Sequence, residues 1–164
     1  MKKFLLVLLV PLVVSATAVA APNPASPAVF CKNLKQAAPA LFAPAPGATY
    51  ANLGACVKVK ASQAAQNTAN AAKTCTAERA LDPAAFASKY GTGNKKNAFG
   101  KCVSATATAA TAAQQTAELN AAKTCKAERV SLGAAAFAAK YGTNASKKNA
   151  FGKCVSKLAK AQQS

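Results

Sequence analysis

The chain carries one cysteine-bounded motif twice. Residues 70–104 and 120–156 match at about 27 of 35 aligned positions once two single-residue gaps are allowed. Each copy opens with a cysteine in Cys-x-x-Glu-Arg and closes with one in Asn-Ala-Phe-Gly-Lys-Cys-Val-Ser. A match of this length indicates a tandem repeat. It constrains the fold more than any other feature, because both copies must adopt one backbone and pair their cysteines in one way.

The cysteines predict a set of disulfides. Their number is even, which in a small exported chain is typical of disulfide bonding. The repeat predicts one pair within each copy and leaves a third pair nearer the N-terminus. Metal binding is the alternative, but the chain has neither a Cys-x-x-Cys pair nor a histidine to complete a mixed zinc site. The predicted pairs are Cys31–Cys56, Cys75–Cys102 and Cys125–Cys154.

The N-terminus has the pattern of an export signal. Lys2 and Lys3 precede the apolar run of residues 4–14, and Ala18-Val19-Ala20 supplies the small residues of a cleavage site. An uncleaved anchor helix is the alternative, although the run is short for a membrane span and Pro11 interrupts it. The pattern predicts a signal peptide over residues 1–20, no transmembrane segment after its removal, and a secreted or envelope-associated protein.

Residues 28–60 have the features of a degenerate first copy. Cys31-Lys32-Asn33-Leu34-Lys35 aligns with the start of the motif, and Asn52-Leu53-Gly54-Ala55-Cys56-Val57 aligns with its end. Prolines replace helix-forming residues between them, and terminal repeats are often atypical. We therefore expect a Pro-rich N-terminal repeat over residues 21–61, a second repeat over 62–112 and a third over 113–164.

The composition and the helix start and stop signals predict an all-α fold of tandem, disulfide-stapled helical repeats. Asp82-Pro83 is a helix start, the aromatic pair Phe86 and Tyr90 is spaced for one helix face, and Gly91 is placed for a left-handed cap. Asn97 is expected to cap the following helix. The second copy repeats these signals with Phe137, Tyr141, Gly142 and Asn149.

The segment between the two copies bears on how they are joined. Residues 104–119 contain neither glycine nor proline, which favours one continuous helix from about 97 to 129. The alternative is a flexible linker rich in alanine and threonine, because threonine is a mediocre helix former. Few large apolar residues serve the mature chain, so we expect the disulfides to carry much of its stability.

The charge is strongly basic. The formal charge is +17, and removal of Lys2 and Lys3 leaves 19 basic and 4 acidic residues. Such a charge attracts anionic polymers, although the lysines can also serve only to keep an alanine-rich chain soluble. Arginine occurs only at Arg79 and Arg129, and no nucleic-acid-binding module is present. Sequence-specific nucleic-acid binding is therefore not expected.

One group of lysines recurs in each copy, beside the helix that Asn97 or Asn149 is expected to cap. Cations at a helix N-terminus oppose the helix dipole, so they are not explained by helix stability. Together with free backbone N–H groups they suggest an anion site, whereas the structural alternative is that they extend into water. The candidate anion-binding residues are Lys95, Lys96, Lys101, Lys147, Lys148 and Lys153.

The paired residues Glu78-Arg79 and Glu128-Arg129 suggest a structural role. We expect each glutamate to accept backbone hydrogen bonds from the Tyr-Gly-Thr turn and each arginine to bridge helices. Catalysis is not expected, because the mature chain has four carboxylates and no histidine to act as a general base. No cofactor is implied.

The motif resembles a repeat found in exported proteins of actinobacteria that have no assigned activity. The resemblance covers residues 70–104 and 120–156, and weakly 28–60, which lacks Glu-Arg and Tyr-Gly-Thr. It implies export and a bacterial source and implies no chemistry.

The function expected from the sequence is non-enzymatic and electrostatic, namely association with anionic envelope or extracellular polymers. Two alternatives stay open: a helical scaffold for specific protein–protein binding, and a membrane-active cationic protein. The second alternative requires a large apolar face opposite the lysines.

Overall fold

The protein is all-helical in a computed structural model that describes residues 23–163. The predicted signal peptide of residues 1–20 lies outside the described residues. Within them the α-helices are α1 (Pro27–Ala37), α2 (Leu53–Leu81), α3 (Pro83–Tyr90), α4 (Ala98–Leu132), α5 (Ala134–Tyr141) and α6 (Ala150–Ala161), and one 3-10 turn, η1, covers Pro39–Leu41. No strand is present in this part of the chain, where Phe42 and Tyr50 form an isolated bridge.

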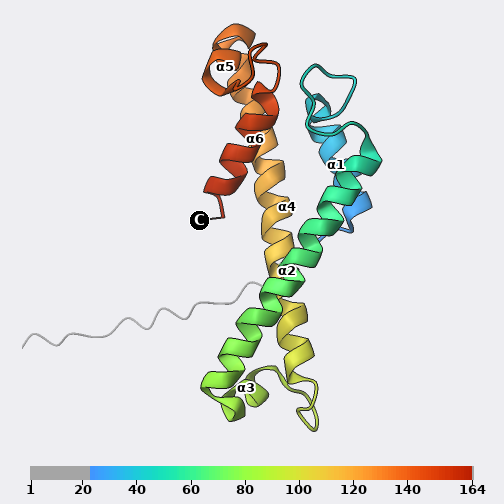
Figure 1. Ribbon diagram of the computed structural model, residues 1–164, viewed down its shortest axis with the longest axis vertical. Coiled ribbons are helices and arrows are strands. Elements are labelled where there is room, and N and C mark those ends of the chain that lie inside the picture. Colours follow the sequence, from blue (N-terminus) through green and yellow to red (C-terminus); the bar gives the residue numbers. More distant parts are fainter. Residues whose placement is uncertain (1–22, 164) are drawn as a thin grey trace, which may run out of the picture.

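Helices α2 and α4 form a long antiparallel hairpin that runs the length of the molecule (Figure 1). The continuous helix expected across residues 104–119 is confirmed, and α4 extends it from Ala98 to Leu132. Both helices run without a break through the predicted segment boundaries at 61/62 and 112/113. The three segments are therefore joined by shared helices.

The start signals predicted for the short helix α3 are confirmed. The Asp82 carboxylate accepts hydrogen bonds from the backbone N–H groups of Ala84 and Ala85, and Pro83 occupies the first helical position. The Phe86 and Tyr90 rings pack on one face with their centroids 4.9 Å apart. In α5 the Phe137 and Tyr141 rings lie 5.0 Å apart.

The prediction that Gly91 and Gly142 adopt a left-handed conformation is wrong. Their φ angles are −79° and −71°, which any residue adopts. Glycine is needed there because a Cβ atom would meet the carbonyl oxygen four residues earlier and the backbone of the following loop. In the two loops that follow these glycines, Lys95 and Lys147 are left-handed, with φ of 62° and 54°, as is Gly93 in the first loop.

All three predicted disulfides are confirmed. Cys31–Cys56 joins α1 to α2, Cys75–Cys102 joins α2 to α4, and Cys125–Cys154 joins α4 to α6. All six cysteines are buried. Each bond crosslinks a helix pair inside a core, as expected for a chain with few large apolar side chains.

The core is divided between the two ends of the hairpin. At one end Cys75, Phe86, Ala98 and Cys102 form a small cluster around α3. At the other end α1, η1, α5, α6 and the ends of α2 and α4 share a larger core that includes Phe30, Leu34, Phe42, Phe137 and Phe151. The first and third segments thus share one core, and the middle segment has a separate core of its own.

The first and third segments make a close backbone contact at Gly47. Its φ is +70°, and a Cβ atom there would meet the backbone of Lys148 and Asn149. Gly93 has a similar φ of +56°, but a Cβ atom there would meet nothing within 4 Å.

We predict that Gly47→Ala lowers the free energy of unfolding more than Gly93→Ala does. A left-handed alanine costs about 1–2 kcal/mol at either position, and a backbone clash at Gly47 adds about 1–3 kcal/mol. Urea unfolding followed by circular dichroism measures both variants. Equal losses would contradict the tight contact between the segments.

Candidate functional site

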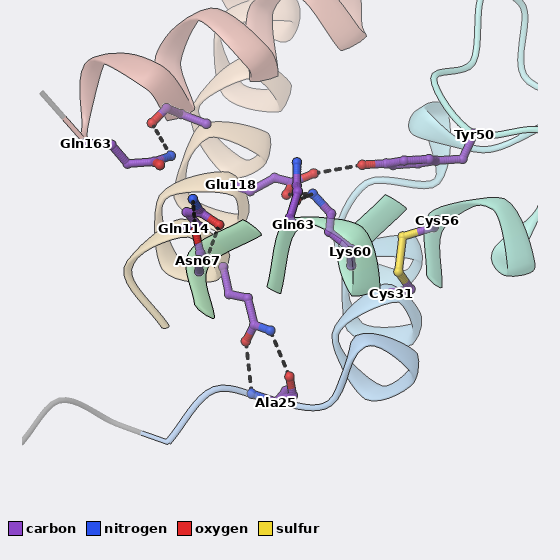
Figure 2. Close-up of polar contacts among 12 residues, drawn as sticks. Ala25, Cys31, Tyr50, Cys56, Lys60, Gln63, Asn67, Gln114, Glu118 and Gln163 are labelled. Carbon is purple, nitrogen blue, oxygen red and sulfur yellow. Dashed lines mark hydrogen bonds and ion pairs between the residues drawn. A yellow bond between two sulfur atoms is a disulfide. The ribbon is translucent and has the colours of Figure 1, made fainter. Parts of the chain in front are cut away.

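A buried ion pair lies between α2 and α4 and is the most developed polar site of the described residues (Figure 2). The Lys60 ammonium donates to Glu118 Oε2 and, over 3.1 Å, to Gln63 Oε1. It also lies 5.5 Å from the centroid of the Phe30 ring. The Tyr50 hydroxyl donates to Glu118 Oε1 over 3.2 Å. Both carboxylate oxygens are therefore engaged.

The environment of Tyr50 differs from that of an exposed tyrosine. Burial is the main cause that raises the pKa of Tyr50, and the charge of Glu118 and the hydrogen bond to it act in the same direction. The phenol therefore stays protonated and keeps donating to Glu118 at any physiological pH. Lys60, Glu118 and Tyr50 together brace the first segment and α2 against α4.

Amide side chains continue this polar seam along the hairpin. Asn67 and Gln114 exchange hydrogen bonds of 2.9 and 3.2 Å, and Asn67 also donates to Thr111 Oγ1. Gln115 both donates to and accepts from the backbone of Ala25. No buried side-chain nitrogen or oxygen within residues 23–163 lacks a hydrogen-bond partner. Such a seam fixes the register of two alanine-rich helices.

A cleft of about 420 Å³ opens over the ion pair. Its walls come from the first segment and from α2, α4 and α6, and they mix apolar and polar side chains. Lys60 and Glu118 face one another at its base rather than a vacant position. The pair is therefore satisfied within the fold. The other side chains that line the cleft include Thr49, Val59, Gln63, Gln114, Val155, Ser156, Lys160 and Gln163.

The lysines predicted to bind anions fall into two separate groups. Lys95, Lys96 and Lys101 lie beside the start of α4, whereas Lys147, Lys148 and Lys153 lie beside the start of α6, at the other end of the hairpin (Figure 1). The structure therefore does not join the six into one site. All six are exposed.

Two of the six lysines already have internal acceptors. Lys95 Nζ donates to Ser88 Oγ over 3.1 Å, and Lys147 Nζ donates to the Gly142 carbonyl over 3.0 Å. Both residues also adopt a left-handed backbone conformation. Lys96, Lys101, Lys148 and Lys153 have no ion pair or side-chain hydrogen bond within residues 23–163. They are the members available to an anion.

The expectation that Asn97 and Asn149 cap the following helices is wrong in its mechanism. Both occupy the N-cap position, but neither side chain bonds to its helix. Asn97 Oδ1 instead accepts from the backbone N–H of Thr92, and Asn97 Nδ2 donates to the Thr92 hydroxyl. Asn149 makes the same two bonds with Thr143. Each asparagine therefore closes the loop before its helix.

The glutamates of the doubled motif have structural partners other than those predicted. Glu78 accepts from Lys89 Nζ at 2.7 Å and from the Tyr90 hydroxyl at 2.9 Å. Glu128 makes the matching bonds with Lys140 and Tyr141 at 2.6 and 2.8 Å. The prediction of backbone donors from the turn is wrong, because the short helix turns its last two side chains toward the glutamate.

The two arginines of the motif differ from each other. Arg79 of α2 places its guanidinium 4.9 Å from the centroid of the Phe99 ring on α4, so it does bridge two helices. Arg129 makes no hydrogen bond, ion pair or ring contact within residues 23–163. The bridging role predicted for both is confirmed for Arg79 alone.

Acid is expected to weaken the contacts that Glu78 makes with the end of α3 and that Glu128 makes with the end of α5. The hydrogen bond from Lys140, and then that from Tyr141, lowers the pKa of Glu128 below its ordinary value of 4.5; Glu78 is affected in the same way by Lys89 and Tyr90. A lowered folded-state pKa contributes stability above the ordinary pKa and loses it as pH falls through the folded value.

We therefore predict a loss of stability below about pH 4.5 that is smaller in Glu128→Gln than in the parent chain. The check is thermal unfolding of both proteins between pH 7 and pH 2. Parallel curves over that range would exclude a contribution from Glu128.

Neither a metal-binding cluster nor a membrane-spanning helix is present among the described residues. No group of three or more His, Cys, Asp or Glu side chains among residues 23–163 is placed to hold a metal ion. Within the same residues no helix is both long enough and apolar enough to span a membrane.

Comparisons with known protein families, with curated proteins and with solved structures found no match.

The sequence reasoning missed Lys60, Glu118 and Tyr50. Lys60 and Glu118 are 58 residues apart, and no local pattern connects them. One signal was present: Glu118 is one of only four acidic residues in the sequence and has no role in the doubled motif.

Proposed function

We propose that the chain is an exported, non-catalytic protein that binds anionic polymers of the cell envelope or its surroundings through lysines that have no carboxylate partner. The observation that carries the proposal is the use made of the four acidic residues. Glu78, Glu118 and Glu128 each pair with one lysine, and Asp82 caps α3. The remaining basic side chains of residues 23–163 have no carboxylate to neutralise them.

The placement of the exposed lysines favours a long ligand. The two lysine groups flank the ends of α4, whose 35 residues make it about 52 Å long at 1.5 Å per residue. A polymer that reaches both groups gains from bivalent attachment, whereas a small anion meets one group at a time. The proposed partner is therefore an extended polyanion.

Export is part of the same proposal. It is supported by the signal-like N-terminus of the sequence and by three disulfides, which persist in oxidising compartments and are rare in the cytosol. An anionic envelope polymer is then the polyanion nearest to the protein.

The test is elution by salt from immobilised poly(glycerol phosphate). We expect retention at about 0.15 M NaCl and release as screening increases. The variant Lys96→Gln/Lys101→Gln/Lys148→Gln/Lys153→Gln is expected to elute at clearly lower salt. The control Lys32→Gln/Lys35→Gln/Lys58→Gln/Lys73→Gln removes four exposed charges elsewhere on α1 and α2 and is expected to elute closer to the parent.

The outcomes separate the parts of the proposal. No retention of the parent chain at about 0.15 M NaCl would contradict polyanion binding altogether. Equal elution of the two variants would contradict the role of the two lysine groups. Retention that persists in high salt would contradict a binding mode that is mainly electrostatic.

A further inference from the structure

An apolar hollow lies where the first segment meets α4 and α5. Its volume is about 330 Å³, within the range of small-ligand sites. Residues 37–40, at the end of α1 and in η1, form one wall, and Val130 and Phe151 contribute to the other. Val130 is 80% exposed, and two other residues that line the hollow, Ala38 and Phe151, belong to the larger core.

A second hollow of about 280 Å³ continues the first. The two share Ala40, Arg129, Ala134 and Phe151, so together they form one groove with Arg129 at its middle. Lys126 lies on the side of the first hollow, and Lys147 and Lys148 lie on the side of the second. No acidic residue lines either hollow. The groove therefore combines apolar walls with cations alone.

Arg129 is the cation best suited to hold a ligand. Its counterpart Arg79 stacks on Phe99, but Arg129 has no stacking, hydrogen-bond or ion-pair partner within residues 23–163. The adjacent carboxylate of Glu128 is already engaged by Lys140 and Tyr141. A guanidinium presents two parallel donors that match a carboxylate.

We propose that this groove binds a medium-chain fatty carboxylate, with the carboxylate on Arg129 and the acyl chain along residues 37–40, Val130 and Phe151. Charge complementarity selects this occupant. A cationic amphiphile would meet three or more like charges, and a purely polar anion would leave Val130 and the apolar wall uncovered. Covering that wall adds the hydrophobic contribution of the chain to the ion pair at Arg129.

The experiment is calorimetric titration of laurate, kept below its micelle concentration, into the full oxidised chain. We expect one site per chain and a negative heat-capacity change, the mark of apolar burial. Arg129→Gln is expected to weaken binding about tenfold or more, because a charge-assisted hydrogen bond is lost. Arg79→Gln removes the same charge from the matching position of the other copy and is expected to bind like the parent.

A second pair of variants tests the apolar part. Ala134 is exposed at the start of α5 and lines both hollows, so Ala134→Phe fills the groove, whereas Ala135→Phe places the same ring on a residue that lines neither. We expect Ala134→Phe alone to abolish binding, with unchanged circular dichroism in both. Equal affinities of Arg129→Gln and Arg79→Gln, or equal binding of dodecyltrimethylammonium and laurate, would overturn the proposal. So would full binding by Ala134→Phe.

Discussion

Removing the Cys75–Cys102 disulfide is expected to unfold the α3 end of the molecule while the opposite end stays folded. The buried core at that end consists of Cys75, Phe86, Ala98 and Cys102. The bond closes a loop with a sequence separation of 27 residues, which contributes about 3.5 kcal/mol in the chain-entropy model. Four buried residues cannot replace a contribution of that size, because a core this small is marginal.

Hydrogen exchange followed by mass spectrometry measures this effect by region. In Cys75→Ala/Cys102→Ala we expect residues 75–103 to lose protection and residues 26–60 and 117–160 to keep it. The control is Cys31→Ala/Cys56→Ala, which acts in the larger core and is expected to lower protection there instead. Uniform loss along the chain in either variant would show that the two ends unfold as one unit.

The second large effect is expected at the buried ion pair. Glu118→Leu is predicted to lower the free energy of unfolding by about 3–5 kcal/mol, because it leaves the charge of Lys60 buried without its carboxylate. Lys60 is 9% exposed, and its remaining contacts are the amide of Gln63 and the faces of Phe30 and Tyr50. The Tyr50 hydroxyl also loses its acceptor.

A mutant cycle distinguishes a lost charge pair from lost packing. Lys60→Met/Glu118→Leu removes both charges and should recover much of the stability, and adding Tyr50→Phe should recover more. The control is Lys89→Met at the Glu78 pair, where the lysine is 61% exposed and the loss should be far smaller. Urea unfolding at pH 7 measures all four variants. A double variant no more stable than Glu118→Leu would contradict the ion-pair explanation.

Much of the fold was predictable because its signals are local. Asp82-Pro83 marks the start of α3 through one capping side chain and one restricted φ angle, and both act within three residues. The continuity of the long helix α4 follows from residues 104–119, which contain neither glycine nor proline. The cysteine pairs follow from the doubled motif, because each copy contains one pair of equal placement.

The rest depends on partners that are distant along the chain. The Asn97 side chain can accept a hydrogen bond either from the helix that follows it or from the backbone of the loop that precedes it. Only the folded loop shows that the donor is the Thr92 N–H. Glu78 likewise finds Lys89 and Tyr90 only once α3 turns back on α2. The ion pair of Lys60 and Glu118 requires the register of the whole hairpin. Sequence patterns with a period of three or four residues contain none of this information.

The division of the core also sets an order of folding. The α3 end is built from residues 75–103, so its contacts are local and can form early. The other end joins Phe30 and Gly47 to Phe137 and Lys148, about a hundred residues later. Contacts between residues this far apart in the sequence form slowly. The core around α1 therefore stays incomplete until α6 has been synthesised. During that interval we expect the face of the first segment that packs on α4, α5 and α6 to be exposed, so the N-terminal third of the chain is expected to be the part most dependent on protection from aggregation.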